Sequence, residues 1–558
     1  MRKQIIGIFR PHLLCLCVGL LTSLQSRAYK MGEKYFSQPS TTAAQSHFSQ
    51  VPSAEIQRSK FDRSHGHKTT FDAGNLVPVF VDEVLPGDTY HMSSTAFCRL
   101  ATPLKPIMDN IFLDTHFWFV PYRLVWDHWQ EFMGERKNPD DNPGIYSVPT
   151  TAIDMALIPP DGLVNYFGIP RRPSGATTVS ALPFRAYLAI WNEWYRDQNL
   201  TDFEPYQTDD GPDVNWGIVP CSKRGKRHDY FTSCLPWPQK GDPVTIPLGD
   251  SAPVVATANI VTTIVDGTTR NLQMTAGNAN IGYVPPNAGA TQPFYFGPQT
   301  GLEADLQAAT AITINDLRTA FQIQRLLERD ARGGTRYIEL ILSHFGVRSD
   351  DARLQRPEYL GGGTSMVNIN PIAQTVPVTD SPQANLAATG TGVNKGGFTK
   401  SFTEHGVIIG LISARADLTY QQGIERFWSR HTRYDFYWPA LAHLGEQAVV
   451  NKEIYAQGLP VDYDVFGYQE RYAEYRYKPS RISGLFASDD PTSLDVWHLS
   501  QDFTTLPVLN DSFIYENPPI DRIIAVPTEP HFLCDVWFSL QCDRPMPVYS
   551  VPGLIDHF

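Results

Sequence analysis

Short apolar runs bounded by prolines recur along the chain and constrain its fold more than any other feature. NLVPVFVDEV (75–84) and IFLDTHFWFVP (111–121) are followed much later by HGVIIGLISARADLTY (405–420) and HFLCDVWFSLQC (531–542). Runs of this kind, bounded by turn-forming residues, are typical of β-strands. The first and last runs lie far apart in the sequence, which favours a sandwich whose ends meet in one sheet. The run 405–420 is apolar and then alternates, so we expect it near a sheet edge.

Composition supports a β-rich chain with a large core. The 558 residues include 44 prolines and 40 glycines, which favour turns over long helices, and 42% of the residues are apolar. Only three segments have helical spacing, and each lies in a long connection between strands. They are 123–134, 183–198 and the segment from Thr313, a capping-type start, to Gly334.

Charge and cysteine content limit the possible partners and chemistry. The net charge of −12 argues against a chain that coats nucleic acid uniformly, so such contacts would need local basic patches. The seven cysteines are dispersed and contain no C-x-x-C pair. We therefore predict no disulfide framework and no zinc site, and a reducing compartment.

The first 75 residues read as two segments without a core of their own. Residues 1–30 have basic residues followed by an apolar run, Leu13 to Leu21, as in a secretory signal. That run is shorter than the roughly 20 residues that span a bilayer, and no other segment qualifies. The other interpretation is a translated upstream region with the working start at Met31. Residues 31–75 are polar and predict an extended arm.

Two later segments, 242–305 and 361–400, contain long stretches that are nearly free of charge. Between Ser251 and Thr300 only Asp266 and Arg270 are acidic or basic. We expect both segments to be exposed loops that contact other surfaces. The alternative is a linker, but the β-branched residues of 254–265 favour a small local β unit in the first segment.

No pattern in the chain predicts catalysis, a cofactor or a metal. His65 and His67 could ligate a metal only together with His116 or His228, and H-E-x-x-H is absent. WNEWYRD (191–197) resembles the Asn-Glu pair of some glycosidases, but an amphipathic helix that packs in the core explains it better. GGGTSMV (361–367) lacks the phosphate-loop and dinucleotide-loop spacings.

Two basic patches are candidates for contact with single-stranded nucleic acid or for facing the interior of an assembly. Stacked bases need aromatic side chains, and phosphates need cations. The alternatives are a surface strand with packed tyrosines or a protein interface rich in Tyr and Arg. The candidates are Lys223, Arg224, Lys226 and Arg227 in one patch, and Arg471, Tyr472, Tyr475, Arg476 and Lys478 in the other.

Long stretches of the sequence resemble the major capsid proteins of the Microviridae, small single-stranded DNA phages, and in particular the gokushovirus branch. They cover most of the chain from residue 48 onward, apart from the uncharged segments. Residues 1–30 depart from this family, which is why Met31 is favoured as the start. The stretches are 48–89, 99–135, 230–241, 397–449 and 549–558.

The resemblance implies an eight-stranded antiparallel jelly roll over 76–558, with long, partly helical insertions between strands. Leu76 to Val81 would be the first barrel strand, and His65 and His67 would lie at a subunit contact. Residues 242–305 fit an insertion that forms a surface protrusion for host attachment.

The same resemblance implies a structural role without enzymatic activity or membrane insertion. Many copies would close into a T=1 icosahedral shell around circular single-stranded DNA, assembled in the host cytoplasm. Further partners would be a host surface receptor and other virion proteins, including a small basic DNA-binding protein. The alternative, suggested by the signal-like start and the many aromatics, is a secreted carbohydrate-binding or glycoside-cleaving β-protein.

Overall fold

The computed structural model describes residues 56–138, 140, 143–214, 216–244, 314–334, 336–347, 355–379 and 381–549, with five short strands between 254 and 304. The predicted extension 1–30 and most of the predicted arm lie outside these residues. The chain divides into a compact unit, Lys60–Arg544, and a second unit formed by the two chain ends, Met1–Ser59 and Pro545–Phe558.

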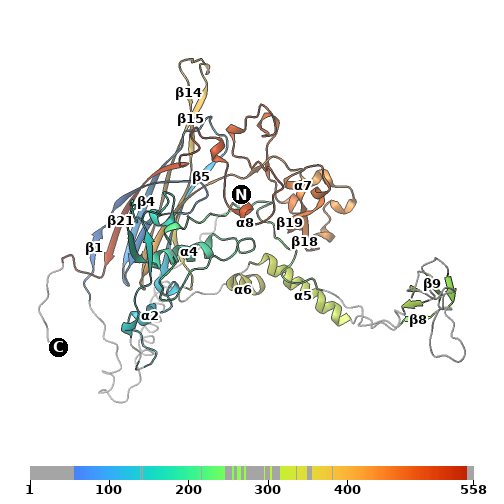
Figure 1. Cartoon of the computed structure of the whole chain (residues 1–558), viewed down its shortest axis with the longest axis horizontal. Helices are drawn as coiled ribbons and strands as arrows, with labels where there is room; N and C mark the ends of the chain where they lie inside the picture. Colours follow the sequence, from blue (N-terminus) through green and yellow to red (C-terminus); the bar gives the residue numbers. More distant parts are fainter. Residues whose placement is uncertain are drawn as a thin grey trace, which may run out of the picture. The chain divides into compact units, whose positions relative to one another are not determined.

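Two antiparallel sheets form the centre of the compact unit (Figure 1). The six-stranded sheet has the order β1-β21-β4-β15-β14, and β2 also pairs with β21. Its strands are β1 (Ser59–Asp62), β2 (His65–Phe71), β4 (Thr89–Leu100), β14 (Asn368–Ala373), β15 (Leu386–Ser401) and β21 (Phe532–Arg544). The four-stranded sheet, in the order β13-β5-β16-β3, contains β3 (Val77–Val84), β5 (Ile111–Pro121), β13 (Glu358–Met366) and β16 (Gly406–Ala416).

The chain passes repeatedly from one sheet to the other, and the core lies between them. Phe117 of the four-stranded sheet contacts Phe398 of the six-stranded sheet, with ring centroids 5.6 Å apart. Phe80 and Phe538 meet in the same way at 5.1 Å. The predicted mainly β, antiparallel architecture is confirmed, because apolar side chains of both sheets fill a common interior.

The two ends of the chain meet in one sheet, but through different strands from those expected. The predicted first strand corresponds to β3, which belongs to the four-stranded sheet. The strands that pair with the last strand, β21, are β1 and β2, which come from the end of the predicted arm. Polar residues can occupy β2 because only one of its faces packs against the core.

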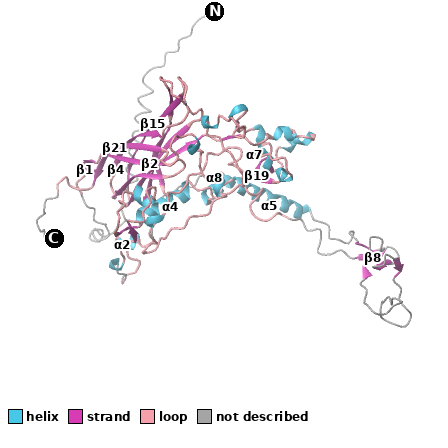
Figure 2. Ribbon diagram, turned by 45° about the horizontal axis from the view of Figure 1, so that its top comes forward, coloured by secondary structure: helices cyan, strands magenta, loops and turns pink. Residues whose placement is uncertain are grey.

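The prediction that 405–420 lies near a sheet edge is wrong. β16 lies between β5 and β3, and every residue in it except Arg415 is buried. The helix α4 (Leu182–Trp194) packs against both β5 and β16 and covers their second face. Figure 2 shows α4 next to the strands of the compact unit. An apolar run without alternation is therefore the mark of a strand buried on both faces.

The connection from β5 to β13 carries most of the α-helices among the described residues. The helices predicted at 183–198 and from Thr313 are confirmed, as α4 and α5. The helix predicted at 123–134 is reduced to short turns, because the amide of Asp127 donates to the carbonyl of Thr208 instead of continuing a helix. The elements here are η2 (Tyr122–Leu124), α2 (Trp129–Phe132), η3 (Pro143–Ile145), β6 (Thr150–Asp154), α3 (Leu163–Tyr166), β7 (Ala176–Ser180), α4, η4 (Trp216–Ile218), α5 (Ile314–Arg332) and α6 (Tyr337–Phe345).

The connection from β16 to β21 surrounds a second, smaller core around Phe231, Val449 and Phe466. Its strands are β17 (Thr419–Tyr420), β18 (Glu446–Val450), β19 (Val465–Glu470) and β20 (Ser480–Arg481). Its helices are α7 (Asn451–Ile454), α8 (Asp511–Ile514), and the 3-10 turns η5 (Arg426–Ser429), η6 (Arg433–Asp435), η7 (Pro439–Leu441), η8 (Pro460–Tyr463), η9 (Ala473–Tyr475), η10 (Gly484–Phe486), η11 (Asp495–Trp497) and η12 (Ile520–Arg522).

The uncharged segment 361–400 is not the predicted loop but largely strand, in β13, β14 and β15. β13 and β15 belong to different sheets and approach each other backbone to backbone. A Cβ at Gly363 would lie 2.0 Å from the carbonyl oxygen of Lys395, and one at Gly361 would lie 2.4 Å from that of Gly397. The glycines of GGGTSMV are therefore required by the junction of the two sheets.

The uncharged segment 242–305 contains two small antiparallel sheets among the described residues, in agreement with a local β unit. β8 (Val254–Ala256) pairs with β12 (Leu302–Ala304). β9 (Val261–Ile264) pairs with β10 (Thr269–Asn271) and β11 (Phe294–Tyr295). Within the described part of the chain, no helix combines the length and apolarity needed to cross a membrane.

One cysteine pair corrects the prediction that the chain has no disulfide. Cys98 on β4 and Cys534 on β21 face each other in register and form a disulfide. They are 436 residues apart in sequence, so their spacing carries no signal and only the pairing of the strands brings them together. Cys221, Cys234 and Cys542 are free and buried.

Candidate nucleic-acid interface

The six-stranded sheet has one face that no other described element covers fully. Residues of β4 and β21 alternate strictly between buried and exposed along most of their length. Buried residues such as Ala96 and Phe538 face the core, and the residues between them face outward. Because side chains alternate across a strand, β2, β21, β4 and β15 together present one continuous outward surface. We call it the open face.

The strand register places aromatic, cationic and hydroxyl side chains in rows across the open face. Trp537 is 55% exposed and Phe97 is 38% exposed, which is unusual for residues of this size on a sheet. One row contains Thr70, Leu533, Arg99 and Thr391; the next contains Lys68, Asp535, Phe97 and Val393; the third contains Gly66, Trp537, Thr95 and Lys395.

Cations on the open face are only partly neutralised. The ammonium group of Lys68 forms an ion pair with Asp535, with Nζ 2.6 Å from Oδ2. Arg99 and Lys395 have no carboxylate partner among the residues that the structure describes, and the guanidinium of Arg99 lies 5.3 Å from the ring centre of Phe97. The open face of this acidic chain thus carries two exposed aromatic rings and two cations without a described carboxylate partner, one of which, Arg99, lies beside a ring.

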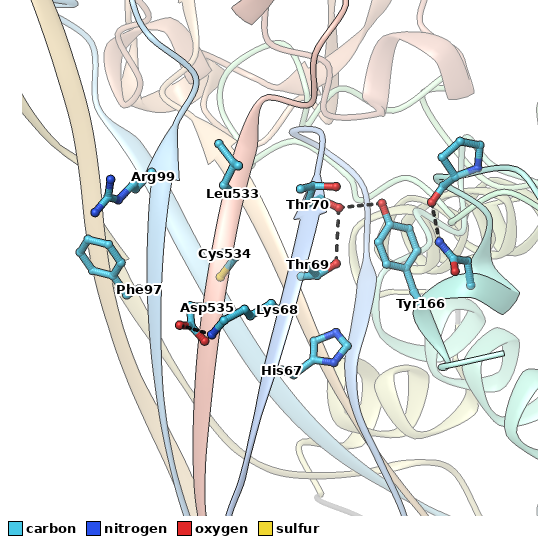
Figure 3. Close-up of a pocket in the computed structure, with 12 residues that line it drawn as sticks. His67, Lys68, Thr69, Thr70, Phe97, Arg99, Tyr166, Leu533, Cys534 and Asp535 are labelled. Atoms are coloured by element: carbon cyan, nitrogen blue, oxygen red, sulfur yellow. Dashed lines mark hydrogen bonds and ion pairs between the residues drawn. The ribbon is translucent and has the colours of Figure 1, made fainter. Parts of the chain in front are cut away.

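A shallow depression of about 610 Å³ lies at the β2 side of the open face (Figure 3). Tyr166 bounds it, with its hydroxyl donating to the carbonyl of Thr70 at 2.9 Å. The pKa of His67 is lowered by burial and by the neighbouring His65, which favours a neutral ring. Its Nε2 atom is buried without a hydrogen-bond partner in the described part of the chain. The depression is therefore lined by the Lys68–Asp535 pair on the outward side of β2 and by a neutral imidazole on the other side of this strand.

This arrangement has the chemistry that single-stranded nucleic acid requires. Exposed rings provide surfaces on which bases stack, and nearby cations pair with phosphates. The sequence signal for it is present in TAFCRL and DVWFSL, where aromatic and cationic residues occupy the positions between core residues. Sequence reasoning missed it because the two strands become neighbours only through their register.

The first predicted basic patch is not one exposed surface. Arg224 and Lys226 are buried. Arg224 donates to Asp114 and to Ser413, both at 2.7 Å, and the ammonium of Lys226 lies 4.6 Å from the ring centre of Phe513. Arg227 covers the ring of Phe112 at 3.8 Å, and the carbonyl of Lys223 accepts a bond from Trp191. These residues attach their own segment to the sandwich.

The second predicted patch contains cations that are paired with carboxylates. Arg476 forms an ion pair with Glu470, and Lys478 lies 3.1 Å from Glu425. Arg471 covers the ring of Tyr472, which is buried, whereas Tyr475 is exposed. The neighbouring carboxylates would repel phosphate, so this patch is weaker than the open face as a site for nucleic acid.

The two histidines of the predicted subunit contact both lie on β2. The ring of His65 packs beside Phe80 and Phe538, with centroids 5.9 and 5.2 Å away, and Nδ1 is 2.9 Å from the carbonyl of Arg63. Neither histidine is brought to His116 or His228 in a metal-binding group, and no such group of three or more ligands occurs among the described residues.

A buried polar cluster lies on the covered face of the four-stranded sheet. Burial opposes ionisation of Asp114, but Arg224, Thr364 and Arg415 outweigh it and lower the pKa of this carboxyl. Its partners are close: Arg415 Nη2 at 2.6 Å, Thr364 Oγ1 at 2.6 Å and Arg224 Nη1 at 2.7 Å. Burial and then Arg224 lower the pKa of the adjacent His116 to about 4.

Comparison with known proteins extends over nearly the whole chain. Residues 49–554 match the family model described as capsid protein (F protein). Capsid protein VP1 of Bdellovibrio phage phiMH2K is 48% identical, over 92% of this chain and 98% of that protein. Capsid protein VP1 of Chlamydia phage 1 is 45% identical (91% and 97% covered), and that of Spiroplasma virus 4 is 37% identical (91% and 97% covered).

Proposed function

This chain belongs to the capsid protein (F protein) family, and on that premise we propose that many copies of it close into a T=1 icosahedral shell around circular single-stranded DNA. It is the structural major capsid protein of a phage virion, as the resemblance to the gokushovirus branch predicted, and not an enzyme. The alternative of a secreted carbohydrate-binding or glycoside-cleaving protein receives no support from these matches.

We propose that eight strands form the jelly roll: β2, β3, β4, β5, β13, β15, β16 and β21. The support is their order, β2-β21-β4-β15 in one sheet and β3-β16-β5-β13 in the other. Antiparallel strands that alternate between two packed sheets are typical of this fold. The insertions between β5 and β13 and between β16 and β21 would then be additions to a common scaffold.

We propose that the open face contacts the packaged DNA. The observation that carries the proposal is that Trp537 and Phe97, both exposed, share this face with Arg99 and Lys395, which have no carboxylate partner among the described residues. A net charge of −12 repels DNA over most of the surface, so attraction must be local. The excess acidity also supports the proposal that a small basic virion protein assists in neutralising the genome.

The test is a double substitution, Arg99→Gln with Lys395→Gln, in full-length unassembled subunits. Binding of a fluorescent single-stranded oligonucleotide is measured over a series of salt concentrations. Loss of two phosphate contacts should weaken binding and reduce the slope of log K against log salt by about 1.4. Particles carrying the same variant should contain less DNA.

The matched control removes two cations from the second predicted patch, Arg476→Gln with Lys478→Gln. These cations already pair with Glu470 and Glu425, so binding and slope should change little. An open-face variant that binds like the wild type would refute the contact. A larger loss of oligonucleotide binding in the control would indicate that the DNA-binding site lies in residues 468–481 instead.

We further propose that residues 242–305 mediate host attachment at the particle surface. The support is the near lack of charge between Ser251 and Thr300 and the presence of small β sheets that are separate from the two sheets of the sandwich. Because loop-closure cost grows slowly with length, a Gly/Ser link in place of 250–290 should preserve shells and abolish attachment. If the shortened protein no longer formed shells, the segment would be needed for the shell itself and the proposal would be wrong.

Three more proposals complete this function. Assembly takes place in the host cytoplasm, and residues 1–30 are dispensable for it, because a shell protein made there needs no secretory signal.

Lys223 and Arg227, the less buried members of the first patch, face the particle interior or a subunit boundary. His65 and His67, on the side of β2 next to the core edge, lie near a subunit contact.

A further inference from the structure

The Cys98–Cys534 disulfide is unexpected in a chain with the proposed function. Thiols of proteins that are made and assembled in a cytoplasm are kept reduced by small thiols and by thiol-reducing enzymes. The cysteine pattern of the sequence also predicted a reducing compartment. The structure nevertheless joins Cys98 of β4 to Cys534 of β21. The pair therefore has a chemistry that the capsid function does not by itself explain.

The disulfide is not needed to hold β4 and β21 together. The two strands pair antiparallel along the whole of β4, and buried apolar residues such as Ala96 and Val536 lie opposite each other next to the cysteines. A reduced cysteine is itself among the most buried side chains and packs as a small apolar group. The sheet therefore accommodates either the disulfide or two thiols.

The pair also differs from the other cysteines that the structure describes. Cys221, Cys234 and Cys542 are free and buried. Burial raises the pKa of each of these three thiols, which lowers their reactivity. Cys534, in contrast, lines the depression at the β2 side of the open face (Figure 3). A small disulfide or thiol that enters the depression therefore reaches one residue of the pair.

The disulfide joins the two strands that carry the aromatic and cationic residues of the open face. Phe97 and Arg99 lie on either side of Cys98 and point outward, and Leu533 lies opposite Arg99. The bond fixes the register of β4 and β21 at this point, between residues that are 436 positions apart in sequence. Because a cross-link that closes a long loop restricts the unfolded chain strongly, the bond should stabilise the subunit.

We propose that Cys98 and Cys534 form a redox-sensitive clamp. The pair is a dithiol while subunits assemble in the host cytoplasm, and it becomes a disulfide after the particle is released into oxidising surroundings. This inference rests on the proposed function, because only a particle that leaves the cytoplasm passes from reducing to oxidising conditions. The clamp strengthens the subunit at the stage when the particle is outside the cell.

The oxidation needs a small disulfide, such as glutathione disulfide, as the electron acceptor. The Cys534 thiolate attacks one sulfur of this molecule, which forms a mixed disulfide and releases one glutathione thiolate. The Cys98 thiolate then attacks the Cys534 sulfur, so that the Cys98–Cys534 bond forms and the second glutathione leaves. Two protein thiols are oxidised, one glutathione disulfide is reduced to two thiols, and each departing thiolate takes up one of the two protons.

The test compares full-length wild-type particles inside host cells with particles that have been released and incubated with glutathione disulfide. Both samples are denatured in the presence of N-ethylmaleimide, and their peptides are identified by mass spectrometry. The peptides that contain Cys98 and Cys534 should be blocked separately in the first sample and joined in the second. A disulfide in both samples would overturn the proposal, and so would free thiols in both.

Thermal unfolding of unassembled subunits supplies a second measurement. Oxidised wild-type subunits should unfold at a temperature at least about 3 °C above that of reduced subunits. The double substitution Cys98→Ala with Cys534→Ala should remove this difference and still allow shells to form. The matched control, Cys542→Ala on the same strand, should keep the difference. Equal unfolding temperatures in the wild type, or a difference that persists in the double variant, would refute the clamp.

The proposed function and the clamp fail in different ways. Wild-type chains that form no shells would count against the capsid function. Released shells in which the two cysteines remain thiols would refute the clamp alone. Contact between the open face and DNA is tested separately, by the Arg99 and Lys395 substitutions, and enters neither of these measurements.

Discussion

The two sheets of the sandwich share one core but differ in what lies on their second faces. The four-stranded sheet is covered by α4 and its neighbouring segments, and its strands β5 and β16 are buried almost throughout. On that side no element of the described chain fully covers the six-stranded sheet, and β4 and β21 alternate between buried and exposed residues. The comparison teaches that the surroundings of a strand decide its sequence pattern, even within one sandwich.

The difference between a covered and an open second face also decides how charged residues on the two sheets contribute to stability. Asp114 on the covered sheet is buried with Arg224 and Arg415, so each charge there depends on its partners. Asp535 on the open face pairs with Lys68 in contact with water. Two aspartates at sheet positions therefore have different energetic roles.

The largest effect is expected from Asp114→Asn. The substitution removes the carboxylate that both Arg224 and Arg415 contact directly. Breaking a buried pair in this way costs about 3–5 kcal/mol. Urea unfolding of the unassembled subunit measures this decrease in the free energy of unfolding. A decrease below about 1 kcal/mol would show that water reaches this cluster.

The second-largest effect is a pH dependence of the folding stability, and it comes from His116. Its pKa in the folded chain, about 4, lies below the ordinary 6.5, so the unfolded chain binds the proton first as the pH falls. The associated stability is complete above pH 6.5 and is lost as the pH falls toward about 4. The wild type should lose roughly 3 kcal/mol more than His116→Gln over this range. Parallel pH profiles of the two proteins would contradict a buried neutral His116.

The smallest effect is expected from Asp535→Asn, the open-face counterpart of the first substitution. An exposed ion pair contributes about 0.2–1 kcal/mol to stability, so the free energy of unfolding should change little. Oligonucleotide binding should instead become slightly tighter, because Lys68 is released for phosphate. A destabilisation as large as that of Asp114→Asn would mean that the open face is covered in the subunit.

Several elements could be predicted from local pattern alone. The runs that became β3, β5, β16 and β21 contain enough apolar and β-branched residues to indicate strands without any tertiary information. α4 and α5 were predictable for the same reason, from helical spacing and, for α5, a capping residue at its start. The length and specificity of the matching stretches were also sufficient to indicate the capsid family.

Features that depend on which strands become neighbours could not be predicted. The Cys98–Cys534 disulfide, the junction at Gly363 and the rows of the open face all join residues that are remote in sequence. The basic run at 223–227 was wrongly predicted to be one exposed patch for a related reason. The sequence does not show that Arg224 pairs with Asp114, a buried residue of a distant strand.

The sequence by itself thus determined the β class, the main strands and helices and the family, because periodicity and composition act over a few residues. Only the tertiary structure decided which cations are neutralised and which aromatics stay exposed. Burial and ion pairing are set by contacts between distant segments, and a cation beside a carboxylate in space can be hundreds of residues from it in the chain. That is why Arg224 became part of the scaffold and Arg99 remained on the open face.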